Sequence, residues 1–212
     1  IVPNKILSGA GLAMGYLLQR SLRFRSSASA YLSRTPATAT NRTTWTYSFW
    51  MKLGVIGSAQ EILFTAGSFK PQIQLENGYL NIYSESGATC SVGTNQVFRD
   101  PSAWYHVVFS VDTTQATASN RIIIYVNGIQ VPVSAFDGIG APAYPVQNYQ
   151  FDVNNTVAHK IGIKYDNTVP FDGYMAEVNF IDGQALTPSS FGQTDAVTGV
   201  WTPKKYTGTY GT

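Results

Sequence analysis

The chain has few of the side chains that carry redox or metal chemistry. Its 212 residues include one cysteine, Cys90, and two histidines, His106 and His159. A single cysteine excludes an internal disulfide and the paired cysteine spacings of zinc sites. Disulfides are frequent in small secreted domains, so their absence favours assembly in a reducing compartment.

Charge is also scarce, and acidic residues are missing from the first part of the chain. Charged residues make up 12% of the sequence, against about 25% in typical globular domains. Residues 1–60 contain seven bases and no acid, whereas the rest carries a net charge of −5. A basic amino-terminal region predicts docking to an acidic surface, although solvated strand positions explain these bases equally well. The expected docking residues are Lys5, Arg20, Arg23 and Arg25. Because these bases are scattered and only Arg23 and Arg25 flank an aromatic residue, we expect no nucleic-acid partner.

No apolar run is long enough to span a bilayer. Residues 6–18 form the most apolar stretch near the start, with 13 residues and three glycines, whereas a spanning helix needs about 20. No small-residue cleavage site follows this stretch before Arg20, so we do not interpret it as a signal peptide. Residues 1–19 are predicted to form an extended arm that needs a partner for order, followed by one domain over residues 20–212.

Aromatic residues are plentiful and alternate with polar ones, as in half-buried β-strands. Strands are expected at residues 21–25, 45–53, 61–65, 72–75, 79–83, 103–111, 121–126, 129–131, 157–164 and 174–181. Asn77-Gly78 and Asn127-Gly128 predict two tight hairpin turns. Crossover helices are absent from the pattern, so the sequence predicts an all-β antiparallel sandwich or barrel.

The segment from residue 171 to residue 192 combines a strand with a short helical turn. Tyr174, Ala176, Val178 and Phe180 alternate with the intervening residues and predict one fully apolar face. Thr187-Pro188 predicts a capped helical turn after the strand.

Four blocks taken in order resemble the laminin-G-like and pentraxin-like jelly roll. They are residues 47–52 (YSFWMK), 104–108 (WYHVV), 122–128 (IIIYVNG) and 171–177 (FDGYMAE). The resemblance covers residues 20–192 and implies an antiparallel β-sandwich jelly roll of the concanavalin A-like lectin/glucanase type. It points to a binding or structural module.

A narrower resemblance concerns residues 21–35 and 198–208, which look like virion proteins of tailed marine bacteriophages and large algal viruses. It implies a non-enzymatic structural protein of the virion surface, either a capsid decoration or a tail fibre or knob module. Assembly in the host cytoplasm, contacts with other virion proteins and homo-oligomers would follow. A lectin-like module that binds host-surface glycans is the alternative.

The sequence lacks the arrangement of catalytic residues that related enzymes have. Related sandwiches include glucanases, and glycoside cleavage needs two carboxylates about 5–9 Å apart. None of the four glutamates lies in the E-x-D-x-x-E strand of those enzymes. His106 and His159 lie in strand patterns and are interpreted as structural, and Cys90 as inert. We therefore expect no catalytic residue.

The long loop over residues 134–156 is the predicted glycan or partner site, because binding residues concentrate on loops of rigid scaffolds. It combines aromatic rings with amide and carboxylate groups: Tyr144, Asn148, Tyr149, Asp152, Asn154 and Asn155. Packing of this loop against a neighbouring subunit is an equally good interpretation.

Calcium is the single cofactor considered, since some relatives in the resembled family bind it at the rim of the sandwich. Asp166, Asn167 and Asp172 are the candidate ligands, close together across one turn. Ordinary turn chemistry explains the same residues. The family often has an Asp-Glu pair where this chain has Ala176-Glu177, which removes one carboxylate.

Overall fold

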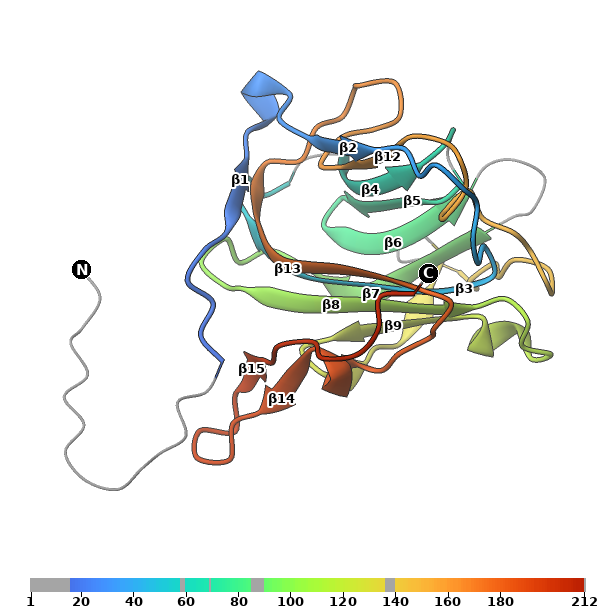
Figure 1. Ribbon diagram of the computed structural model, residues 1–212. Helices are drawn as coiled ribbons and strands as arrows, with labels where there is room; N and C mark the ends of the chain where they lie inside the picture. Colours follow the sequence, from blue (N-terminus) through green and yellow to red (C-terminus); the bar gives the residue numbers. More distant parts are fainter. Residues whose placement is uncertain (1–15, 58–59, 69, 85–89, 136–139, 212) are drawn as a thin grey trace.

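Two antiparallel sheets pack face to face in a computed structural model that describes residues 16–57, 60–68, 70–84, 90–135 and 140–211 (Figure 1). The six-stranded sheet has the order β1 (Leu22–Phe24), β13 (Gly173–Asp182), β3 (Thr44–Leu53), β8 (Tyr105–Asp112), β9 (Ile122–Val126) and β10 (Ile129–Gln130). The seven-stranded sheet has the order β11 (Val133–Ser134), β7 (Cys90–Val97), β6 (Tyr79–Ser84), β5 (Gln72–Glu76), β4 (Gln60–Ala66), β12 (His159–Ile161) and β2 (Leu32–Arg34). The predicted β-sandwich is confirmed. Of the predicted arm, only residues 16–19 lie within the described ranges, and Lys5 lies outside them.

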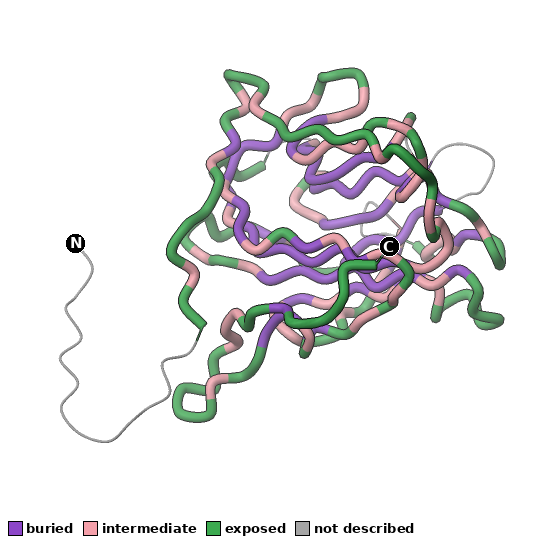
Figure 2. Tube along the Cα trace, in the orientation of Figure 1, coloured by how far each residue is buried: buried purple, intermediate pink, exposed green. Residues whose placement is uncertain are grey.

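Alternation along β3 sets the core. Trp45, Tyr47, Phe49 and Met51 are fully buried between the sheets, as predicted, and Trp50 lies on the opposite face. The rings of Trp45 and Tyr47 contact rings from other strands and form an aromatic cluster with them. Figure 2 shows these central strands as buried. This cluster is the main source of hydrophobic stabilisation, because aromatic side chains bury the largest areas.

Both predicted hairpin turns are present. Asn77 and Gly78 have φ of 50° and 83°, and Asn127 and Gly128 have φ of 49° and 83°. Only glycine and, less often, asparagine adopt this left-handed region at low cost. The turns fix the register of β5 with β6 and of β9 with β10.

The predicted apolar face of β13 is wrong, because a bulge between Ala176 and Asn179 interrupts the alternation. Met175 precedes the bulge and packs in the core. Phe180 follows the bulge and also packs against the core, although unbroken alternation would place residues 175 and 180 on opposite faces. A bulge inserts an unpaired residue and switches which residues face inward. Glu177, at φ 46°, lies within it.

The carboxyl-terminal segment covers part of the outer face of the six-stranded sheet. A second apolar cluster forms there from Val108, Ile181, Phe191 and Tyr206. The predicted helical turn is present as the 3-10 turn η3 (Pro188–Ser190). After it, β14 (Gly192–Thr194) pairs with β15 (Trp201–Pro203) beneath the sheet (Figure 1). Two further 3-10 turns are η1 (Ser26–Ala28) and η2 (Ala118–Asn120).

Most of the strands that the sequence pattern did not predict are short, but β7 has eight residues. β2, β7, β11, β14 and β15 were not expected, and the strand predicted over residues 157–164 is confined to β12.

Cys90 is fully buried at the start of β7, where burial raises the pKa of its thiol to about 12. In the described part of the chain, no helix has the length and apolarity to cross a membrane.

Candidate functional site

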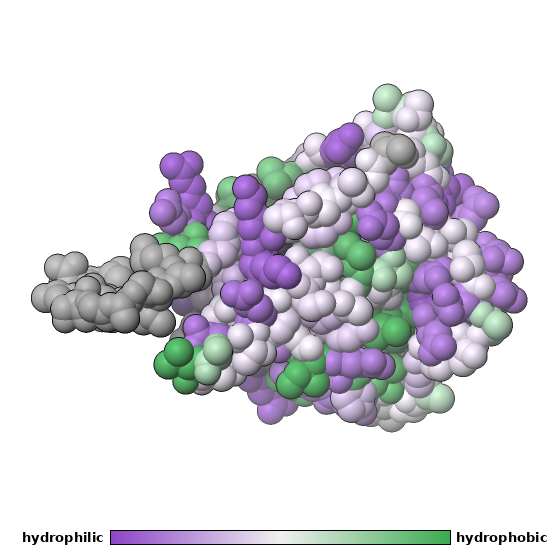
Figure 3. All heavy atoms as spheres, turned by 60° about the horizontal axis from the view of Figure 1, so that its bottom comes forward, coloured by the Kyte–Doolittle hydropathy of each residue, from purple (hydrophilic) through white to green (hydrophobic). Residues whose placement is uncertain are grey.

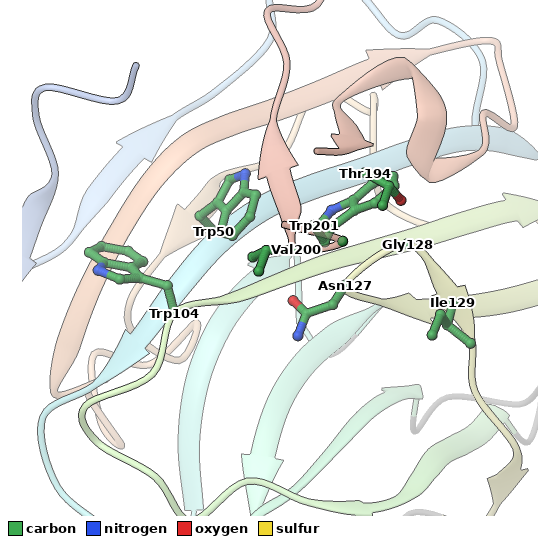
Figure 4. A pocket seen from close by; sticks show the side chains of 9 residues that line it. Trp50, Trp104, Asn127, Gly128, Ile129, Thr194, Val200 and Trp201 are labelled. Carbon is green, nitrogen blue, oxygen red and sulfur yellow. The ribbon is translucent and has the colours of Figure 1, made fainter. Parts of the chain in front are cut away.

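Three tryptophans gather on the outer face of the six-stranded sheet. Trp50 comes from β3, Trp104 directly precedes β8, and Trp201 begins β15. Alternation places Trp50 outward because Phe49 and Met51 point to the core. We call this surface the tryptophan groove; it comprises Trp50, Trp104 and Trp201 with the side chains that line the hollows beside them (Figure 4).

A stack of three rings supports the groove. His106 lies opposite Trp50 across the β3–β8 pairing, with ring centroids 5.0 Å apart. The ring of Trp201 also contacts His106, with the ring centroids 5.9 Å apart. Gly128 and Gly192 leave room for the Trp201 indole, since a Cβ at either glycine would overlap it. The Trp201 indole therefore helps to hold the β14–β15 hairpin on the sheet, together with the apolar cluster of Phe191 and Tyr206.

Hydrogen bonds determine which ring nitrogen of His106 carries the proton. Trp201 Nε1 donates to His106 Nδ1 at 3.0 Å, because an indole nitrogen can only donate. The imidazole proton then lies on Nε2, which is 3.0 Å from Ser48 Oγ. Burial lowers the pKa of His106 to about 4, so the ring is neutral at physiological pH. It serves as a structural acceptor, in agreement with the sequence interpretation.

Stability should therefore fall as the pH is lowered. Because the pKa of His106 is lower in the folded chain than its ordinary 6.5, its contribution is complete above pH 6.5 and is lost as the pH falls towards 4. The difference corresponds to roughly 3 kcal/mol. Burial also lowers the pKa of His159, which acts in the same direction. Thermal unfolding between pH 4.5 and 7.5 should show a steeper pH dependence for the wild type than for His106→Gln, and equal slopes would contradict this assignment.

Two adjoining hollows make up the groove, and both are lined by Trp50 and Trp104. One, of about 390 Å³, lies against the β9–β10 turn and Val200. The other, of about 490 Å³, lies between residues 16–21 and β15. Trp104 is 37% exposed and Trp50 7%. Figure 4 shows the indoles of Trp50 and Trp104 on one side of the first hollow and Trp201 with Thr194 on the other.

Polar groups lie at the rim of the groove. They include Arg20, Asn127, Gln193, Thr194 and Asp195. Figure 3 shows this side of the molecule with apolar patches separated by polar ones. Aromatic rings beside amide, hydroxyl and charged groups are the composition of a ligand site for a polar molecule with apolar faces. The sequence pattern does not indicate this site, because its residues are far apart in the chain.

The predicted loop residues are engaged with the body of the protein. Tyr144 and Tyr149 pack against the main core. Asp152 pairs with Arg42 at 2.9 Å, and Asn154 Nδ2 donates to Asp182 Oδ1 at 2.8 Å. Asn155 Nδ2 lies 3.4 Å from Asp152 Oδ1, and Asn148 is exposed. A glycan role for this loop stays a prediction.

The predicted calcium ligands each accept hydrogen bonds from other partners. Asp166 Oδ1 accepts from Thr168, and Asn167 Oδ1 accepts from Lys160 Nζ at 2.6 Å. Asp172 pairs with Arg23 at 2.6 Å and also accepts from Ser26. Within the described ranges, no group of three His, Cys, Asp or Glu side chains could hold a metal ion. Calcium binding at these residues stays a prediction.

Of the basic residues predicted to dock, Arg23 makes internal contacts. Besides Asp172, its guanidinium lies 5.0 Å from the ring centroid of Tyr174. Arg20 and Arg25 are exposed. Arg23 thus ties β1 to β13, while the other two remain at the surface.

A row of polar side chains lies on the face of the seven-stranded sheet that points away from the core. Gln74 Oε1 accepts from Gln60 and Gln72, and Gln74 Nε2 donates to Glu76 at 2.6 Å. Gln72 and Gln74 are nearly fully buried. The alternating amides of the QIQLE segment are the signal in the sequence for this row, which was not among the predicted sites.

Comparisons with known proteins agree with this architecture. Residues 26–190 match the family model of the concanavalin A-like lectin/glucanases superfamily, and the chain belongs to this superfamily. Its fold resembles that of a Bacteroides ovatus protein described as a candidate carbohydrate-binding protein, with 19% identity, a TM-score of 0.54, and coverage of 80% of this chain and 44% of that one. Domains LG4-5 of the mouse laminin alpha1 chain give 13% identity, a TM-score of 0.51, and coverage of 84% and 45%.

These likenesses confirm the predicted laminin-G-like resemblance at the level of the fold. The chain spans less than half the length of either structure. A search of curated protein sequences finds no match.

Proposed function

We propose that this chain is a carbohydrate-binding module that holds a glycan in the tryptophan groove. The observation that carries the proposal is the exposed indole of Trp104 beside the nearly buried Trp50. A sugar ring has apolar C–H faces and polar edges, so it suits an indole surface with hydrogen-bonding groups at its rim. Trp50 Nε1 is buried and has no acceptor among the described residues, so an acceptor from a ligand or water would satisfy it.

Binding without cleavage is the proposed activity. Asp195 is the single carboxylate among the described residues that line the groove, and its Oδ1 already accepts from Val197 and Thr198. General acid–base cleavage of a glycoside uses two carboxylates on opposite sides of the bond. Release of reducing sugar by the purified protein would overturn this part of the proposal.

A glycan array tests the groove directly. Trp104→Ala should weaken binding at least about tenfold, since losing an exposed aromatic platform removes roughly 1.4 kcal/mol or more. Asn148→Ala, at the exposed position of the predicted loop, is the matched control and should bind as the wild type does. Thermal unfolding checks that both variants remain folded: Trp104 is exposed, and alanine in place of Asn148, where φ is 61°, should cost only about 1–2 kcal/mol of backbone strain.

The results for the two variants distinguish the tryptophan groove from the loop over residues 134–156 as the glycan site. Loss of binding in Asn148→Ala with retention in Trp104→Ala would move the site to the loop over residues 134–156. Absence of glycan binding by the wild type would overturn the proposed function itself.

A protein-binding role on a virion is a second proposal, and it rests on the sequence resemblance of residues 21–35 and 198–208. Exposed apolar side chains around the groove favour a protein interface: Leu17 at 69%, Ile129 at 70%, Val197 at 81% and Val200 at 58%. Clusters of this kind mark interaction sites on soluble proteins. We propose a homo-oligomeric module on the virion surface, assembled in the host cytoplasm, that contacts other virion proteins.

A further inference from the structure

A cavity of about 800 Å³ opens at one side of the sandwich, away from the tryptophan groove. β1 pairs only with residues 173–175 of β13, so the rest of that strand has no partner on this side. On the opposite sheet, β2 is the edge strand. The cavity lies between these two edges, and residues 36–40 and 210–211 border it.

Aromatic rings form the inner wall of the cavity. Tyr47, Phe64 and Phe180 line it, with ring centroids 4.9 to 5.9 Å apart. The β13 bulge adds Val178, which is 37% exposed. Cavities of 300–1,000 Å³ with apolar walls and a few polar groups are typical of small-molecule sites.

One polar group on this wall lacks a partner. Tyr47 is fully buried, and its hydroxyl has no hydrogen-bond partner among the described residues. A buried hydroxyl without a partner is costly, so it favours any ligand that brings an acceptor. Burial raises the pKa of this phenol, which keeps it protonated and able to donate.

The charged groups that line the cavity, Arg34 and Asp182, are exposed or already hydrogen-bonded, so neither is a buried counter-ion for a charged ligand. His159 Nδ1 lies 2.8 Å from Val157 O, and its Nε2 accepts from Asn154 N at 3.0 Å, so both nitrogens of the neutral ring are used. Asp182 Oδ1 accepts from Asn41 and Asn154. Arg34 is exposed at the rim, and Tyr210 Oη donates to Asn179 Oδ1 at 2.9 Å. A charged ligand would lose its hydration on entry without a buried counter-ion.

We propose that this cavity binds an uncharged, ring-containing small molecule that accepts one hydrogen bond from the Tyr47 hydroxyl. The aromatic wall suits a flat apolar body, and the unpartnered donor selects a carbonyl or hydroxyl oxygen on it. The site is independent of the glycan proposal, since it shares no residue with the tryptophan groove.

Three small probes test the proposal on the full chain: acetophenone, which has a ring and one carbonyl; ethylbenzene, which lacks the acceptor; and benzoate, which is charged. Dissociation constants from ligand-observed NMR should be roughly three- to tenfold lower for acetophenone than for ethylbenzene, the range expected for one hydrogen bond. Benzoate should bind most weakly. In Tyr47→Phe, which removes only the unpartnered oxygen and should fold normally, acetophenone and ethylbenzene should bind equally.

A second variant locates the binding. Val178→Trp should fill the cavity and weaken all probes at least tenfold, whereas Val197→Trp, at an exposed position outside the cavity, should leave them unchanged. The proposal is overturned if no probe binds, if benzoate binds as tightly as acetophenone, or if the acetophenone preference survives in Tyr47→Phe.

Discussion

Replacing Trp45 with alanine is expected to lower the free energy of unfolding by about 3–5 kcal/mol, the range for deleting a fully buried aromatic side chain. Trp45 is fully buried. Its ring stacks on Phe180 at 5.6 Å and meets the edge of Phe151 at 5.7 Å. The substitution leaves a cavity between the sheets and removes the contact that holds residue 151 of the long loop against the core.

Trp104→Ala is the matched control for this prediction, since it deletes the same side chain at a position that is 37% exposed. Denaturant unfolding of both variants and the wild type measures the difference. Burial, not residue type, is the cause of the expected loss. Equal destabilisation of the two variants would show that the core is not organised around Trp45.

Gly128→Ala is expected to cost roughly 2–5 kcal/mol through two effects that act together. The residue has φ of 83°, where a side chain adds about 1–2 kcal/mol of backbone strain. Its Cβ would also lie 2.5 Å from the Trp201 indole, and overpacking of this kind costs about 1–3 kcal/mol. The indole must move, so the contact between Trp201 and His106 should be lost.

Gly199→Ala separates strain from overlap. Gly199 has a similar φ of 69°, but a Cβ there meets no atom within 4 Å. We expect it to lose only the strain contribution and to keep the near-ultraviolet circular dichroism signal of the stacked rings. Gly128→Ala should change that signal, and an unchanged signal would mean that the Trp201 position does not depend on the glycine.

The tryptophan groove and the cavity depend on different parts of the fold. The groove forms where the β14–β15 hairpin lies against the outer face of one sheet, as Figure 1 shows. The cavity forms because β1 pairs with only the first part of β13. A glycan result for the groove and a small-molecule result for the cavity can therefore be obtained separately.

Long strands could be predicted from the sequence because their side chains alternate over many residues. β3 and β8 each combine aromatic or branched residues at every second position with a run of at least eight residues. Three-residue strands such as β2, β14 and β15 are too short to show a period. β2 forms by pairing with β12, and β14 and β15 form by pairing with each other, so all three depend on contacts between segments and not on a local pattern.

The β13 bulge shows a different limit. Tyr174 to Ile181 alternates without a break in the sequence, yet Met175 and Phe180 both contact the core. Local pattern assumes unbroken pairing, and the bulge depends on how β13 fits against β3. The error in the predicted face follows from that assumption.

By itself, the amino-acid sequence determined the all-β class, the two Asn-Gly turns, the inward face of β3 and the resemblance to the concanavalin A-like superfamily. Each of these depends on neighbours within a few residues or on short blocks in order. Tertiary structure alone decided that Trp50, Trp104 and Trp201 meet in one groove and that Tyr47 lines a cavity. The reason is physical: alternation sets which way a side chain points, whereas the distance between remote side chains depends on strand order and on where edges remain unpaired.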